Sequence, residues 1–185
     1  MQTLHHHGRD ASDEVTHLQR EIEELSRALE ADPSDASAAF RRGVLRGQLG
    51  EAERAIEDFT TVLRLDPTSV EALYNRGIAY VQARQHVRAI DDFTEAVRLR
   101  PGHVDALNNR AGAFYELGQA EKALRDAEKV VQLDQKHPGG YAVRAIALAM
   151  LGRDAEADAE ARRALELGFN ARALQALIKR ERDRR

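Results

Sequence analysis

The sequence predicts an all-α protein built as a solenoid of stacked helix-turn-helix hairpins. Three observations predict this fold, and all of them follow a period of about 34 residues. Prolines recur with this spacing at Pro33, Pro67 and Pro101. Small residues recur at two fixed places in the period, namely Gly43, Gly77, Ala111 and Ala145, then Ala55, Ala89, Ala123 and Ala157. Glycines between these places predict a left-handed turn joining two helices, and they are Gly50, Gly118 and Gly152.

The composition favours a soluble helical protein and argues against several functional classes. The 185 residues include 28 Lys and Arg against 31 Asp and Glu, so the formal charge is -3. A protein that binds nucleic acid through its phosphates usually carries a basic excess, so no nucleic-acid partner is expected. No apolar run approaches the roughly 20 residues of a membrane span. The start of the chain lacks the apolar core of a signal peptide, and we therefore expect a cytoplasmic protein.

The N-terminal part of the chain is expected to contain a tail and one helix. Residues 1–12 are polar, with consecutive histidines at 5–7, and are expected to form a flexible tail. Residues 13–32 are expected to be helical, because apolar residues spaced three and four apart share one helical face. These residues are Val15, Leu18, Ile22, Leu25 and Leu29. We interpret this helix as half of a repeat that packs on the stack. The alternative is an oligomerisation helix, because the spacing also fits a short coiled-coil seam.

Residues 33–168 divide into four repeats, at about 34–66, 67–100, 101–134 and 135–168. Two helices of about a dozen residues cannot bury both apolar faces alone, so each hairpin is expected to stack on its neighbours. Thr68 and Glu71 have the spacing of a capping box at the start of the second repeat. Residues 169–185 are expected to form a capping helix, which begins after Asn170 and covers the last apolar face.

The residues that recur at equivalent places of the repeats resemble the pattern of the tetratricopeptide repeat (TPR) family over residues 34–168. The second repeat matches the family pattern best, at residues 73–77, Tyr80, Ala89, Phe93, Ala96 and Pro101. The first repeat departs from the pattern at Ala39 and Arg46, where the family prefers bulky apolar residues. The second repeat has Arg84 where the turn prefers glycine, and the fourth has Ala161 in place of an aromatic residue. The resemblance implies a right-handed α-solenoid that recognises a protein or peptide without covalent chemistry.

The resemblance also implies a binding surface. In TPR proteins the first helix of each repeat lines a concave groove, where peptides or partner helices lie. Carried onto this sequence, the groove takes residues from all four repeats, and these are Phe40, Arg41, Val44, Tyr74, Asn75, Ile78, Gln82, Asn108, Asn109, Gly112, Tyr115, Glu116, Val143, Ile146 and Met150. Asn75 and Asn109 can donate to and accept from a peptide backbone. Tyr74 and Tyr115 offer apolar area with a polar tip, which is typical of binding hot spots.

The partner is expected to be a protein or peptide, and one class is argued against. TPR domains that bind the acidic C-termini of chaperones resemble one another in a clamp of lysine, arginine and asparagine side chains. The cations of this clamp are absent here, because uncharged or acidic residues hold the places on its first and third helices, and these are Phe40, Val44, Tyr74, Ile78, Asp105, Asn109, Gly139 and Val143. Two alternative functions are a homo-oligomer, built through the N-terminal helix or the apolar fourth repeat, and an RNA-binding helical repeat.

We expect no enzymatic activity, no metal site and no cofactor. The chain has no His-Glu-x-x-His motif, no phosphate-binding glycine loop, no Gly-x-Ser-x-Gly motif and no cysteine. An arginine column recurs with the repeat at Arg42, Arg76, Arg110 and Arg144. We interpret it as structural, with each guanidinium paired to a carboxylate of its own or the preceding repeat, because buried charges are normally paired.

Overall fold

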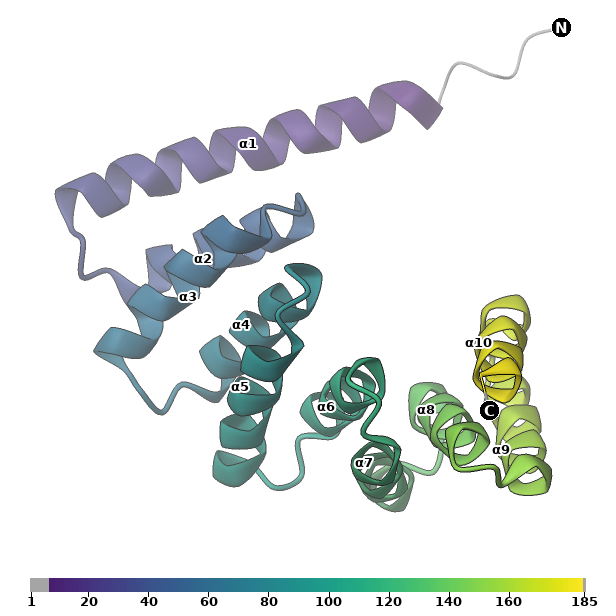
Figure 1. Cartoon of the computed structure of the whole chain (residues 1–185). Helices are drawn as coiled ribbons and strands as arrows, with labels where there is room; N and C mark the ends of the chain where they lie inside the picture. Colours follow the sequence, from purple (N-terminus) through teal and green to yellow (C-terminus); the bar gives the residue numbers. More distant parts are fainter. Residues whose placement is uncertain (1–6, 185) are drawn as a thin grey trace, which may run out of the picture. The chain divides into compact units, whose positions relative to one another are not determined.

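The structure is a computed structural model that describes the backbone of residues 7–184 and the side chains of residues 12–184 (Figure 1). Within the described range the chain forms ten α-helices and no strand. The helices belong to two compact units, of which one ends at Arg84 and the other begins at Gln85. The predicted all-α fold of helical hairpins is confirmed. Six of the residues predicted to form the polar tail, 1–6, lie outside the described residues.

The N-terminal unit contains four helices, α1 (His7–Ala31), α2 (Ala36–Gln48), α3 (Ala52–Leu65) and α4 (Val70–Gln82). Helix α1 begins earlier than the sequence pattern placed it, because it includes residues 7–12 of the expected tail. It packs against α2, which pairs with α3 in a hairpin, and α4 packs on α3 and contacts α2 (Figure 1). We call α2 and α4 first helices and α3 a second helix, after their order in the repeat.

The C-terminal unit contains six helices, α5 (His86–Leu99), α6 (Val104–Glu116), α7 (Ala120–Leu133), α8 (Pro138–Met150), α9 (Asp154–Glu166) and α10 (Ala171–Asp183). The first helices are α6 and α8, and the second helices are α5, α7 and α9. Consecutive helices from α5 to α9 pack on one another, and α6 also contacts α8. The last helix, α10, packs mainly against α8 and less against α9.

Helix α1 contacts α2 in the way that a second helix contacts the first helix after it. In α4 and α6, an arginine Nη1 donates to a threonine hydroxyl of the preceding second helix. Arg42 of α2 makes the corresponding bond to Ser26 of α1. The three bonds are Arg42–Ser26 at 3.1 Å, Arg76–Thr60 at 3.2 Å and Arg110–Thr94 at 3.1 Å. This repetition supports the half-repeat interpretation of α1. The apolar stripe of α1 is not completely buried by this packing, because Val15, at its N-terminal end, is 42% exposed.

Each first helix begins with a side chain that accepts a backbone hydrogen bond, as an N-cap does. The cap of α4 is Ser69, whose Oγ accepts from the Ala72 amide at 3.3 Å. The expectation based on Thr68 was therefore wrong by one residue, because the Thr68 hydroxyl instead donates to Asp66 Oδ1 at 2.8 Å. The predicted cap of the final helix is confirmed, since Asn170 Oδ1 accepts from the Ala173 amide at 2.9 Å.

Small residues let the helices of a hairpin approach closely. The alanines of the second helices at positions 55, 89, 123 and 157 are completely buried. A Cβ atom placed on Gly43 would lie 2.9 Å from Cε1 of Phe59, so α2 and α3 could not pack this closely with a larger residue there. The hairpin turns have positive φ at Gly50, Gly118 and Gly152, with φ of 75°, 71° and 76°. Arg84 takes the same left-handed conformation at φ 59°, although its Cβ makes that conformation less favourable.

Candidate functional site

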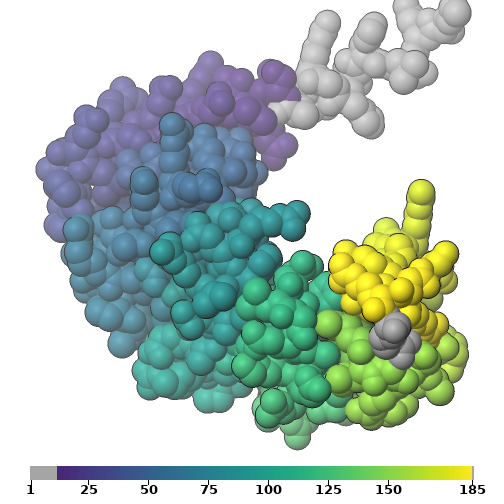
Figure 2. All heavy atoms as spheres, viewed as in Figure 1, coloured from purple at the N-terminus to yellow at the C-terminus, as the bar shows by residue number. Residues whose placement is uncertain are grey.

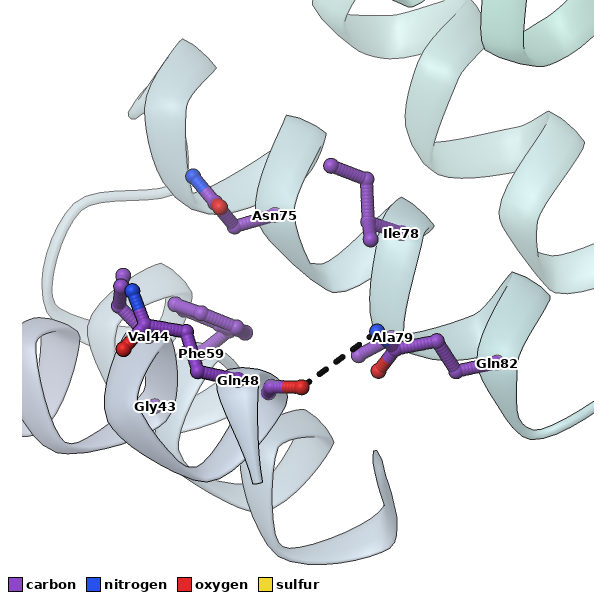
Figure 3. A pocket seen from close by; sticks show the side chains of 9 residues that line it. Gly43, Val44, Gln48, Phe59, Asn75, Ile78, Ala79 and Gln82 are labelled. Atoms are coloured by element: carbon purple, nitrogen blue, oxygen red, sulfur yellow. Dashed lines mark hydrogen bonds between the residues drawn. The ribbon is translucent and has the colours of Figure 1, made fainter. Parts of the chain in front are cut away.

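The N-terminal unit carries a pocket between its first helices α2 and α4. Its volume is about 300 Å³. The lining residues are Gly43, Val44, Gly47 and Gln48 of α2, Phe59 of α3, and Asn75, Ile78, Ala79 and Gln82 of α4 (Figure 3). Two first helices thus contribute facing side chains to one concave site. The sequence predicted this for the first helices, and four of its residues (Val44, Asn75, Ile78 and Gln82) meet here.

The floor of the pocket is apolar and firmly packed. Phe59 is only 2% exposed, and its ring contacts that of Phe40 edge to face, with the ring centroids 5.6 Å apart. Val44 is partly buried against the same cluster. Phe40 therefore packs against the floor without lining the pocket, although the sequence predicted it as a groove residue. Apolar walls that are already fixed before binding suit a site that accepts an apolar side chain.

The rim of the pocket carries amides instead of charges. Asn75 Nδ2 donates to the Glu71 carbonyl oxygen of its own helix at 2.8 Å. This bond orients the amide and leaves Oδ1 and one N–H for a ligand. Gln82 Nε2 lies 3.5 Å from the Gly47 carbonyl oxygen and spans the two helices at the edge of the pocket (Figure 3). None of the nine lining residues is charged. The site therefore fits a neutral segment whose backbone offers donors and acceptors.

Five lining residues were not predicted from the sequence, namely Gly43, Gly47, Gln48, Phe59 and Ala79. Gly47 matters most, because a Cβ atom placed on it would meet no atom within 4 Å. The signal for it was a second glycine one helical turn after Gly43, in a helix that otherwise follows the repeat. Arg41, which was predicted to line the groove, instead pairs with Glu21 of α1 at 2.6 Å and is largely exposed.

The first helices of the C-terminal unit present a different surface. Asn108, Asn109 and Gly112 of α6 are half-buried, and Glu116 is exposed. Val143 and Met150 of α8 are partly buried against the apolar cluster of this unit.

Two predicted groove residues are not open to a ligand in this structure. Tyr115 is 9% exposed and Ile146 is 5% exposed, and both belong to a cluster with Leu174 and Ile178 of α10. Helix α10 was expected to cover the end of the stack, but it covers part of the predicted binding face. The sequence could not reveal this, because the apolar stripe of α10 fits either position.

Tyr115 is also the centre of a polar contact with α10. Its hydroxyl donates to Glu181 Oε1 at 3.2 Å, and Arg180 Nη2 contacts the same hydroxyl oxygen. Glu181 is 4% exposed and also accepts from Arg180 Nε at 3.0 Å. Burial of the phenol, assisted by the negative charge of Glu181, raises the pKa of Tyr115.

Three arginines of the column, Arg42, Arg110 and Arg144, have the structural role that the sequence predicted. Arg42 Nη2 lies 2.6 Å from Asp58 Oδ1, and Arg110 Nε lies 2.7 Å from Asp126 Oδ2. Arg144 pairs with Glu160 in the same way. Each of these carboxylates lies on the second helix of the same hairpin, at a constant sequence separation from its arginine. The first hairpin has a second cation, because Arg46 Nη1 lies 2.8 Å from Asp58 Oδ2.

Two kinds of feature are absent from the described residues. Between residues 7 and 184, no helix has both the length and the apolar composition needed to cross a membrane. Among the described side chains, no group of three or more His, Cys, Asp or Glu residues is arranged to hold a metal ion.

Comparison with known proteins by sequence profile and by structure points to one family. A sequence profile described as tetratricopeptide repeat matches residues 22–70, 45–104 and 74–140. The crystal structure of MamA is 27% identical in sequence, covers 79% of this chain and 85% of its own, and superposes with a TM-score of 0.75. No curated protein sequence matches the chain.

Two more distant structures share the fold. A MamA structure from Desulfovibrio magneticus RS-1, beginning at its residue 41, is 20% identical, covers 86% of this chain and 92% of its own, and has a TM-score of 0.77. YrrB, a TPR protein with an unusual peptide-binding site, is 24% identical, covers 88% of this chain and 87% of its own, and has a TM-score of 0.68. At these identities the likeness shows the fold alone.

Proposed function

Because this chain belongs to the tetratricopeptide repeat family, we propose that it is a non-catalytic scaffold that binds a segment of a partner protein. The pocket between α2 and α4 receives one small apolar side chain of that segment. The amides at its rim hold the backbone of the same segment in an extended form. The ligand segment is uncharged where it enters the pocket.

One observation carries this proposal, namely the meeting of Val44, Asn75, Ile78 and Gln82 around one open cavity. All four belong to the groove that the sequence predicts. The volume of about 300 Å³ lies at the lower end of the range for ligand pockets, which suits one anchoring side chain better than a whole small molecule. The absence of charge among the nine lining residues argues against an acidic chaperone tail as the ligand.

YrrB offers a parallel for this proposal, because that protein has a peptide-binding site on the same fold. The parallel concerns the use of the fold and does not transfer any residue. The proposal therefore depends on the pocket of this chain and not on the likeness.

The test is selection of peptides from a random displayed library on the purified chain, followed by fluorescence anisotropy with the selected peptides. We expect Asn75→Ala to weaken binding about tenfold, because the ligand backbone loses an oriented amide. The matched control is Arg64→Ala on α3, which is exposed and outside the pocket. Selected peptides that bind Asn75→Ala and Arg64→Ala as tightly as the wild type would exclude this pocket as the site.

Self-association is the second candidate function, and α1 supports it. Val15 is 42% exposed, and it continues the apolar stripe that buries Leu25 and Leu29. We expect light scattering to give a mass above that of the 20.7 kDa chain at high concentration. A Val15→Asp variant should then return to the monomer mass, because a charge in an apolar seam is costly. A wild type that stays monomeric across the concentration series removes this candidate.

A further inference from the structure

The position of α10 departs from the regular stacking of the repeats. In the regular part of the chain, a first helix contacts the second helix just before it more than the first helix before that, as α4 does with α3 over α2 and α8 does with α7 over α6. Helix α10 follows the second helix α9, yet it packs mainly against the first helix α8. Figure 2 shows its surface beside that of α8. It therefore occupies the face on which the sequence predicted a ligand.

The contact of α10 has the form of a helix bound in a groove. Leu174 is completely buried, Ile178 is 4% exposed, and the two lie one helical turn apart on one face. They join the cluster that contains Tyr115 of α6 and Ile146 of α8, and Leu177 packs at its edge. Apolar anchors one turn apart on an amphipathic helix are the usual means by which a helical ligand engages a groove.

A polar contact fixes the other end of the helix. Glu181 lies two helical turns after Leu174, on the same face, and is almost fully buried. Its carboxylate accepts from the Tyr115 hydroxyl of α6, from Arg180 of its own helix and from Arg184, the residue that follows the helix. A buried carboxylate is costly unless it is paired, so this contact sets which helix fits and in which register.

We propose that the face formed by α6 and α8 is a binding surface for an amphipathic helix, and that α10 occupies it as an intramolecular ligand. A partner helix with the same pattern displaces α10, namely apolar residues at its first and fifth positions and a carboxylate at its eighth. This inference rests on the proposed scaffold function, because it assigns a class of ligand to the first helices of the C-terminal unit.

The connection of α10 to the chain makes it a competitor of any partner. Only residues 167–170 separate it from α9, so its local concentration at the surface is high. The apparent affinity for a partner is reduced by the fraction of molecules in which α10 is in place. A helix of 13 residues is marginal by itself in water, so a displaced α10 loses its helical structure. Weakening α10 in the chain should therefore strengthen binding of the same sequence added from outside.

The experiment uses the full chain and a fluorescent synthetic peptide with the sequence of residues 169–184. We expect Ile178→Ala in the chain to bind this peptide about tenfold more tightly than the wild type, or better, because its own α10 competes less. Glu181→Gln is a second variant that leaves the apolar anchors in place, and it should shift the affinity in the same direction. The matched control is Gln175→Ala, on the exposed side of α10, which should bind as the wild type does.

Two results would overturn the proposal. One is equal peptide affinity for the wild type, Ile178→Ala and Glu181→Gln, all of which are folded by circular dichroism. The other is hydrogen exchange in which the amides of α10 open only together with those of α8, because α10 would then be an inseparable part of the core. A variant that becomes dimeric without gaining peptide affinity counts against it as well, since the surface would then accept only a second copy.

The test is independent of the pocket in the N-terminal unit. Asn75→Ala should leave binding of the α10 peptide unchanged, whereas it should weaken the library-selected peptides. Loss of the selected peptides alone would therefore affect the proposed pocket, and loss of the α10 peptide response alone would affect only this inference.

Discussion

Gly47 of α2 and Tyr115 of α6 hold the same place in the repeat, two periods apart. In the N-terminal unit the glycine leaves an open pocket, with Ile78 of α4 half-buried on its far side. In the C-terminal unit the tyrosine fills the corresponding place, and Ile146, the equivalent of Ile78, lies buried beneath α10. A single repeat framework thus produces an open site in one unit and an occupied site in the other.

The difference follows from the composition of the first helices. Helix α8 is apolar along most of its length, and its residues 145–149 are all buried. Such a surface is unfavourable in water, so it requires cover. The corresponding residues of α2, 43–47, include two glycines and Arg46, and only Gly43 among them is buried. The repeat therefore determines where a ligand face lies, and a few side chains determine whether that face stays open.

The largest effect that we expect comes from the buried ion pairs, because the N-terminal and C-terminal units differ in the number of arginines paired with each carboxylate. Asp58 is 2% exposed and accepts from both Arg42 and Arg46, whereas Asp126 accepts from Arg110. Removing one partner of a buried pair leaves an uncompensated charge, so we expect Asp58→Asn to lower the free energy of unfolding by about 3–4 kcal/mol. Asp126→Asn should cost about 2 kcal/mol, because it leaves one guanidinium unpaired instead of two.

Urea denaturation of both variants measures this difference. The control is Glu95→Gln, which breaks an exposed pair with Arg98 and should change stability by less than about 1 kcal/mol. Equal losses for the Asp58 and Asp126 variants would show that the second arginine adds nothing to the N-terminal hairpin.

Uncovering the C-terminal face is the next largest change. Ile178→Ala removes buried methyl groups from the contact between α10 and α8, and we expect a loss of about 2–3 kcal/mol. In hydrogen exchange, faster exchange should be concentrated in α10 and should spare α2 and α4. Uniformly faster exchange over both units would mean that α10 stabilises the whole chain and does not merely cover one face.

The fold could be predicted from the sequence, whereas the state of the binding face could be predicted only in part. The regular period, the buried alanines and the arginine column are local consequences of hairpin packing, which recurs along the chain and leaves a clear pattern. The pocket depends on Gly47, and an absent side chain leaves little signal in a sequence. The burial of Tyr115 depends on α10, which packs mainly on α8 and less on α9. The amphipathic pattern of α10 does not determine which of these two helices it packs on.

A large side chain in place of Gly47 should close the pocket of the N-terminal unit, as Tyr115 fills the equivalent place in the C-terminal unit. Space around this residue is open, so Gly47→Tyr should fill the pocket and weaken library-selected peptides by about tenfold or more. Stability should stay within about 0.5 kcal/mol of the wild type, because glycine in a helix interior is itself unfavourable. Gly47→Ala is the matched control, since it adds one methyl group and should keep the binding. Unchanged affinity for Gly47→Tyr would place the peptides elsewhere.

The smallest expected effect is the pH dependence of stability that comes from the Tyr115 hydroxyl. It reports directly on whether α10 buries the face formed by α6 and α8. Burial raises the pKa of this phenol in the folded protein above the value of about 10 for an exposed tyrosine. At lower pH both the folded and the unfolded chain keep the proton, and the contribution of this group is fully present. As the pH rises through about 10, the unfolded chain loses its proton first, so stability falls until the folded pKa is passed.

Urea denaturation between about pH 9 and pH 11 should therefore show a steeper loss of stability for the wild type than for Tyr115→Phe. The phenylalanine keeps the ring in the cluster but removes the titrating group and the hydroxyl that donates to Glu181. In Ile178→Ala the Tyr115 ring becomes more accessible to water. The loss of stability of this variant at alkaline pH should therefore fall between those of the wild type and Tyr115→Phe. Identical slopes for all three proteins would mean that α10 does not shield Tyr115 in solution, and the contrast with Gly47 would then lie in the side chains alone.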